Sequence, residues 1–146
     1  MKWHSLRGTF AECPDPPYLL SSDGPGVVTK LSGLGLELST VTVAASDREK
    51  DLLRRFGEAL GFPAQFHANW DAFYDLVSEF VTTPGRTVAV NVLGADDLAR
   101  ADLRRFVRVV WMLMKPTESV ELGGAGSAQL EFLFRGRWDA GTASGQ

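Results

Sequence analysis

The spacing of apolar residues changes partway along the middle of the chain. Residues 36–43 are rich in β-branched side chains, which predicts a strand. Residues 46–60 have apolar positions at helical spacing, which predicts a helix. Ser46 followed by Glu49 predicts a capping box at its start, and Gly61 is a typical stop at its end. A strand is therefore expected to lead directly into a helix.

A second helical pattern follows Pro63, which disfavours helical geometry in the residue before it. Asn69 is a typical N-cap. The apolar positions that follow it are Trp70, Phe73, Val77 and Phe80. Acids occupy another side of the same helix at i, i+4 and i+8, namely Asp71, Asp75 and Glu79. Like charges one turn apart destabilise a helix by roughly 0.2–0.5 kcal/mol per pair, so helix stability alone does not explain this acidic row.

The remaining pattern alternates between strand and helix. Residues 87–93 are almost uniformly apolar, which is typical of a strand covered on both faces, and Gly94 interrupts them. A helix is predicted from about Asp96 to Pro116, which we expect to end it. Residues 128–134 alternate and predict a third strand.

This order predicts an α/β fold with a small three-stranded parallel sheet packed by helices. Residues 1–35 have too few apolar side chains for a core of their own, and we expect an N-terminal extension that packs on the domain and adds edge strands. Within it, residues 3–10 and 27–31 are candidate strands. The domain itself is expected to span residues 36–136, followed by a flexible tail over 137–146.

Composition narrows the functional classes. The chain has 146 residues, 45% of them hydrophobic and 23% charged, as expected for one globular domain. No apolar run approaches the roughly 18 residues of a membrane span, and the first ten residues lack the apolar region of a signal peptide. The single cysteine, Cys13, excludes an internal disulfide. We therefore expect a cytoplasmic protein.

No catalytic, cofactor-binding or metal-ligating cluster stands out, so we expect neither an enzyme nor a bound cofactor or metal. A row of basic residues at i, i+4 and i+8 offers another reading: Arg100, Arg104 and Arg108. Such a row could contact nucleic acid. The net charge of −3 argues against direct binding to nucleic acid as the main activity.

The segment around the acidic row resembles a known family. Its motif reads Phe62-Pro63, then Asn69, Asp71-Ala72 and Tyr74-Asp75. This is similar to the barstar family, the intracellular inhibitors of secreted bacterial ribonucleases such as barnase. The order of predicted elements also agrees, so the resemblance covers about residues 37–135. It implies a barstar-like fold and an inhibitor that plugs a ribonuclease active site.

The resemblance also implies roles for individual residues. Asp75 would enter the phosphate-binding pocket of the enzyme, Asp71 would meet a second basic group, and Tyr74 would pack beside them where the family usually has tryptophan. Asn69 would fix the loop. Gln65 stands where the founding member has tyrosine, and His67 replaces a glycine. The implied ribonuclease-binding residues are Gln65, Phe66, His67, Asn69, Asp71, Tyr74, Asp75 and Glu79.

The sequence-based interpretation is an intracellular inhibitor of a secreted, guanyl-specific microbial ribonuclease, acting as a monomer in a 1:1 complex. One alternative is an immunity or antitoxin protein against another nuclease toxin. A further alternative is a non-inhibitory, RNA-associated module that uses Arg100, Arg104 and Arg108.

Overall fold

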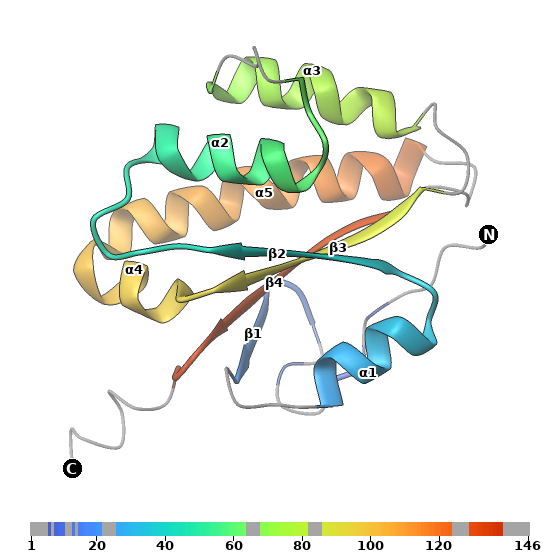
Figure 1. Cartoon of the computed structure of the whole chain (residues 1–146), viewed down its shortest axis with the longest axis horizontal. Helices are drawn as coiled ribbons and strands as arrows, with labels where there is room; N and C mark the ends of the chain where they lie inside the picture. Colours follow the sequence, from blue (N-terminus) through green and yellow to red (C-terminus); the bar gives the residue numbers. More distant parts are fainter. Residues whose placement is uncertain are drawn as a thin grey trace.

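The computed structural model describes residues 6, 8–10, 13, 15–21, 26–63, 68–81, 86–123 and 129–138 (Figure 1). Within these ranges the elements follow the order β1 (Tyr18–Ser21), α1 (Gly26–Gly33), β2 (Glu37–Thr42), α2 (Glu49–Ala59), α3 (Trp70–Val81), β3 (Thr87–Leu93), α4 (Ala95–Ala101), α5 (Leu103–Gly123) and β4 (Gln129–Gly136). The predicted alternation of strands and helices over the central part of the chain is confirmed. None of the described helices is long and apolar enough to cross a membrane.

The sheet is parallel throughout, with the strand order β1-β4-β3-β2. The three strands predicted from the sequence form its β4-β3-β2 part. The sheet has four strands and not the three predicted for the domain. The fourth is β1 of the N-terminal extension, which was expected to add edge strands and lies at the edge beside β4, with Tyr18 opposite Leu133. The sequence gives little signal for β1, because this strand has only four residues and begins directly after the Pro16-Pro17 pair.

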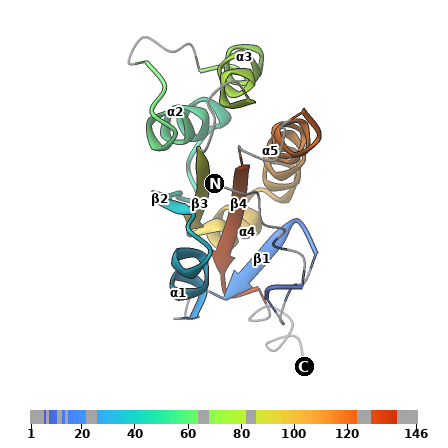
Figure 2. The same ribbon diagram turned by 90° about the vertical axis from the view of Figure 1, so that its right-hand side faces the viewer.

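Helices cover both faces of the sheet (Figure 2). On one face lie α2 and α5, and α3 lies outside them, farther from the sheet. The main core forms between this helical layer and alternate residues of the strands, including Val90 of β3 and Phe132 of β4. On the other face lie α1 and the N-terminal residues, which form a smaller core with Ala89 and Leu133. The prediction that residues 87–93 are covered on both faces is confirmed.

The predicted strand at residues 27–31 is wrong, because this segment belongs to helix α1. Val27 and Leu31 lie one helical turn apart and are both buried against the sheet, whereas Val28 is exposed. The adjacent β-branched residues Val27 and Val28 suggested a strand. The sheet instead buries Val27 and Leu31, whose i, i+4 spacing is helical. The candidate strand at residues 3–10 is also not found where it is described: Thr9 donates its N–H to the carbonyl of Leu6 at 3.0 Å in a turn.

Helix α2 begins at Glu49, three residues after the predicted N-cap Ser46. Asp47 explains the shift, because its carboxylate accepts the N–H of Ala44 at 2.7 Å and bonds to the guanidinium of Arg55. These contacts close a turn that keeps Ser46 outside the helix. The carboxylate of Asp51 then accepts the Arg48 N–H at 3.2 Å at the true start.

The single helix predicted from Asp96 is in fact two helices. The chain leaves helical geometry at Asp102, whose carboxylate accepts the N–H of Arg105 at 3.1 Å and so caps α5. Pro116 does not end this helix, which continues to Gly123. Proline lacks the N–H that would bond to the carbonyl four residues earlier, here that of Met112. The Met112 carbonyl instead accepts a hydrogen bond from the hydroxyl of Tyr74 on α3.

Candidate functional site

Asn69 starts helix α3 as the sequence predicts. Its side-chain oxygen accepts the N–H of Ala72 at 2.8 Å, and its carbonyl accepts the N–H of Phe73 at 3.0 Å. A side-chain cap of this kind typically stabilises a helix by about 1 kcal/mol. Before this helix, Gly61 has a φ of 78°, a left-handed conformation that favours glycine and ends α2. The Asn69 cap therefore sets where the acidic helix begins, and Gly61 sets where α2 ends.

The inner side of α3 is fixed in the core. Phe73 is fully buried and Val77 is 3% exposed, and burying such a side chain contributes about 1.5–3 kcal/mol. Trp70 and Phe62 pack their rings edge-on against Phe73, with centroids 5.7 and 5.5 Å away. Phe73 thus belongs to the main core, and Trp70 is partly buried against it. The side chain of Phe80 lies outside the described part of the structure.

The outer side of α3 carries the acidic ridge, which we define as Asp71, Asp75 and Glu79. All three side chains are exposed. Neither Asp71 nor Asp75 forms an ion pair with another residue that the structure describes. Their negative charges therefore point to solvent, on a helix whose opposite side is anchored. The sequence-based expectation that these acids are available to a partner requires this exposure.

Tyr74 lies between the two sides of α3 and is half-buried. Its hydroxyl donates to the carbonyl of Met112 on α5 at 2.8 Å. This is the carbonyl that Pro116 leaves without a helical donor, so Tyr74 supplies the missing hydrogen bond and ties α3 to α5. Burial raises the pKa of the Tyr74 phenol, and the positive charge of Arg108 partly opposes this increase.

A polar cluster that the sequence analysis missed fixes the first turn of α3. The carboxylate of Glu49 accepts the indole N–H of Trp70 at 2.7 Å. The two oxygens of the same carboxylate share the single Nε–H of Arg108, at 2.9 and 3.0 Å. Glu49 thus joins α2, α3 and α5. These residues are 21 and 59 positions apart in the chain, so no local pattern could have paired them.

The basic row considered in the sequence analysis is not a continuous helical stripe. Arg100 lies on α4, whereas Arg104 and Arg108 lie on α5 beyond the break at Asp102. Arg100 is paired with Asp96 at 2.8 Å and with Asp97 at 3.0 Å. Since Arg108 is held by Glu49, only Arg104 of the three makes no ion pair among the residues described.

Three of the residues implied in ribonuclease binding belong to the segment between α2 and α3: Gln65, Phe66 and His67. They lie outside the described residues, so their contribution stays a prediction. The structure brings the other five together on and beside α3: Asn69, Asp71, Tyr74, Asp75 and Glu79. Among the described residues, no group of His, Cys, Asp or Glu could hold a metal ion.

The chain was compared with known proteins and protein families, and one family model includes the central fold and helix α3. No curated protein matches the chain. A family model matches residues 37–128, which include β2, α2, α3, β3, α4 and α5, and its description is "Barstar (barnase inhibitor)". This match covers more than half of the chain and ends before β4. It also leaves out β1 and α1, which form the added layer on the second face of the sheet. The chain belongs to the Barstar family.

Proposed function

We propose that this protein inhibits a secreted, guanyl-specific microbial ribonuclease by inserting the acidic ridge of α3 into the enzyme's active site. The observation that carries the proposal is the exposure of Asp71 and Asp75 on a capped helix that is anchored on its other side, in a chain of the Barstar family. The protein acts without catalysis, in the cytoplasm, as a monomer that forms a 1:1 complex.

The chemistry of the ridge fits a site that binds RNA phosphate. Such a site is concave and cationic, and a carboxylate carries the charge of a phosphate and can accept paired hydrogen bonds from a guanidinium group. Asp75 enters the phosphate pocket, and Asp71 meets a neighbouring basic group. Opposite charges on the two proteins also accelerate their encounter, which suits an inhibitor that must act before the enzyme does.

The rigidity of α3 supports the same proposal. Binding is weakened when side chains or backbone must first be ordered, so a helix that is already fixed retains more of its interaction energy. Phe73 and Val77 anchor α3 in the core, Tyr74 bonds it to α5, and Glu49 holds its first turn through Trp70. In the complex, Asn69 keeps the preceding loop in place, and Gln65, Phe66 and His67 of that loop contact the enzyme beside the ridge.

The two other interpretations lead to different outcomes. An immunity protein against another nuclease toxin would use the same ridge on a different cationic site, so only the target enzyme separates it from our proposal. An RNA-associated module would need the basic row. Two of the three arginines of this row are engaged by acids of the same chain, which weakens that alternative.

Titration of a panel of microbial ribonucleases with the full chain tests the proposal. We expect near-stoichiometric inhibition of at least one guanyl-specific enzyme, weakened by added salt. Asp75→Ala should lose at least about 2 kcal/mol of binding free energy, roughly a thirtyfold rise in Kd, because Asp75 occupies the centre of the interface.

Glu58→Ala is the matched control. It also removes one exposed acid, but from α2 and outside the ridge, and should leave the Kd within about twofold. An equal loss for both variants would reduce the effect to net charge and refute the assignment of Asp75. Inhibition of only a non-guanyl-specific nuclease would favour the immunity protein, and RNA binding that is insensitive to Asp75→Ala would favour the RNA-associated module.

A further inference from the structure

Helix α5 carries an apolar row that faces solvent. Leu103, Val107 and Trp111 are 63%, 55% and 66% exposed and lie at i, i+4 and i+8, so they form one continuous row along the helix. Single exposed apolar side chains are common, but three in line beside a groove are typical of an interaction site. None of the three belongs to α3 or to the acidic ridge.

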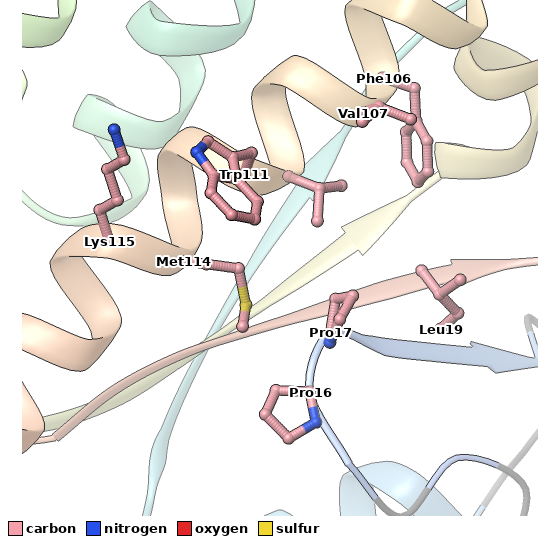
Figure 3. A pocket seen from close by; sticks show the side chains of 9 residues that line it. Pro16, Pro17, Leu19, Phe106, Val107, Trp111, Met114 and Lys115 are labelled. Atoms are coloured by element: carbon pink, nitrogen blue, oxygen red, sulfur yellow. The ribbon is translucent and has the colours of Figure 1, made fainter.

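The row borders an apolar groove between α5 and the start of β1 (Figure 3). The groove has a volume of about 500 Å³. Its α5 wall includes Val107, Val110, Trp111 and Met114, and its opposite wall is formed by Pro16, Pro17 and Leu19. Volumes of several hundred Å³ are typical of binding sites. The groove and the row together extend over Leu103 to Met114, about 16 Å of helix, which matches roughly three turns of a second helix.

The walls favour a helix over an extended segment. Strand addition needs a row of free backbone donors and acceptors along an edge. In the wall opposite α5 only Leu19 has an N–H, because Pro16 and Pro17 lack one. The α5 wall is a helix whose backbone groups bond within the helix. An occupant must therefore satisfy its own backbone hydrogen bonds and contribute an apolar side-chain surface, and an amphipathic helix does both.

The positive charges beside the groove indicate that acidic residues should flank the apolar face of the bound helix. Arg104 and Lys115 are exposed on α5, on the solvent side of Trp111, and neither forms an ion pair with another described residue. On a helix of 3.6 residues per turn, residues 104, 111 and 115 share one side. In Figure 3 the nitrogen atoms of Trp111 and Lys115 both point away from the groove floor. Acidic side chains flanking the apolar face of an incoming helix would meet these donors.

We propose that this groove, bordered by Leu103, Val107 and Trp111, binds an amphipathic helix of a partner protein that carries acids along one flank. The groove lies apart from the acidic ridge, so the two surfaces can be occupied together. The proposal rests on α5 and β1 and is independent of ribonuclease inhibition.

The probe is a fluorescein-labelled helical peptide of roughly 14 residues. It has leucines at i, i+3, i+4 and i+7 and glutamates on both flanks, and a second peptide carries lysines in place of the glutamates. Anisotropy titrations with the full chain should give saturable binding of the glutamate peptide in about the micromolar range. The lysine peptide should bind about tenfold more weakly at low salt.

Three variants locate the binding. Trp111→Glu should raise the Kd of the glutamate peptide at least about tenfold, because it places a charge in the apolar row. Val28→Glu, the matched control on α1, should leave it unchanged. The double variant Arg104→Glu/Lys115→Glu should reverse the preference and bind the lysine peptide more tightly. All these positions are exposed, and circular dichroism verifies that each variant is folded.

Several outcomes would overturn the proposal. They include no saturable binding of the glutamate peptide, equal binding of the two peptides, and a Trp111→Glu variant that binds like the parent chain. Two further measurements test other occupants. Dimerisation in sedimentation velocity that Trp111→Glu abolishes would assign the groove to a second copy. Co-sedimentation with phosphatidylserine vesicles that depends on Trp111, without peptide binding, would assign it to a membrane surface.

Discussion

The two faces of the sheet are built from alternate residues of the same strands, yet they differ in chemistry. Toward α2 and α5, strand β4 presents Leu130, Phe132 and Phe134, all within the main apolar core. Toward α1, the same strand presents Leu133 together with polar side chains that are almost as deeply buried. These polar side chains are Gln129, Glu131 and Arg135.

The polar side chains of the second face bond to one another and to the N-terminal layer. The guanidinium of Arg135 donates to the side-chain oxygen of Asn91 at 3.0 Å and to the carbonyl of Ser21 on β1 at 2.9 Å. Gln129 donates to Glu131 at 2.9 Å. Trp138 adds a further link, since its indole donates to the carbonyl of Leu20 at 3.1 Å.

The difference separates two sources of stability. The face toward α2 and α5 is stabilised by apolar burial, which is not directional. Its close packing tolerates little loss of side-chain volume. The N-terminal face combines a small apolar core with directed hydrogen bonds that fix the position of β1. The extension outside the family match is therefore a layer docked by specific contacts, while the face that supports α3 is an apolar core.

Truncation of a leucine on each face gives the largest expected effect. Leu130 and Leu133 are both at most 1% exposed, on the same strand and on opposite faces. We expect Leu130→Ala to cost about 4 kcal/mol of unfolding free energy and Leu133→Ala about 2–3 kcal/mol, because the smaller core can collapse more readily around a cavity. Urea denaturation measures both. Equal losses would mean that the two cores are equally rigid.

Removal of the Arg135 guanidinium comes next. Arg135→Met keeps much of the volume but leaves the Asn91 side chain and the Ser21 carbonyl without this donor, which should cost about 1–3 kcal/mol. The double variant Arg135→Met/Asn91→Leu removes both partners of one bond. It should recover part of the loss, and a double-mutant cycle by denaturation measures the coupling. Strictly additive losses would show that the Arg135–Asn91 bond between β4 and β3 contributes no coupling energy.

The smallest expected effect concerns the bond between α3 and α5 on the helical side. Tyr74→Phe removes the donor to the Met112 carbonyl and should cost about 1 kcal/mol. Burial raises the pKa of Tyr74 in the folded chain above its usual value near 10. The stability that this group contributes is therefore present below pH 10 and is lost as the pH rises through the raised pKa.

Thermal unfolding at alkaline pH tests that prediction. The parent chain should lose more stability above pH 10 than Tyr74→Phe, and the two curves should converge there. Parallel curves would show that the phenol does not titrate differently in the folded and unfolded chain.

Local patterns were sufficient to predict most of the central fold. Uniform apolar β-branched runs predicted β3, alternating positions predicted β4, and Asn69 with the residues after it predicted the start and the buried side of α3. These features depend on neighbours within about four residues, two apart in the strands and three or four apart in the helix, so a single sequence contains them. The exposure of Asp71 and Asp75 follows from the same periodicity once the apolar side of the helix is buried.

Contacts between distant segments decided the rest. Asp47 moves the start of α2 by binding Arg55, Glu49 joins Trp70 to Arg108, and the Tyr74 hydroxyl allows α5 to continue past Pro116 by bonding to a carbonyl that would otherwise lack a donor. The same holds for β1, since four residues acquire strand geometry only because the edge of β4 is available. By itself the sequence determined which residues could be buried and where helices could start. Only the tertiary structure determined which polar groups meet, because those partners are far apart in the chain and their bonds form only when it is folded.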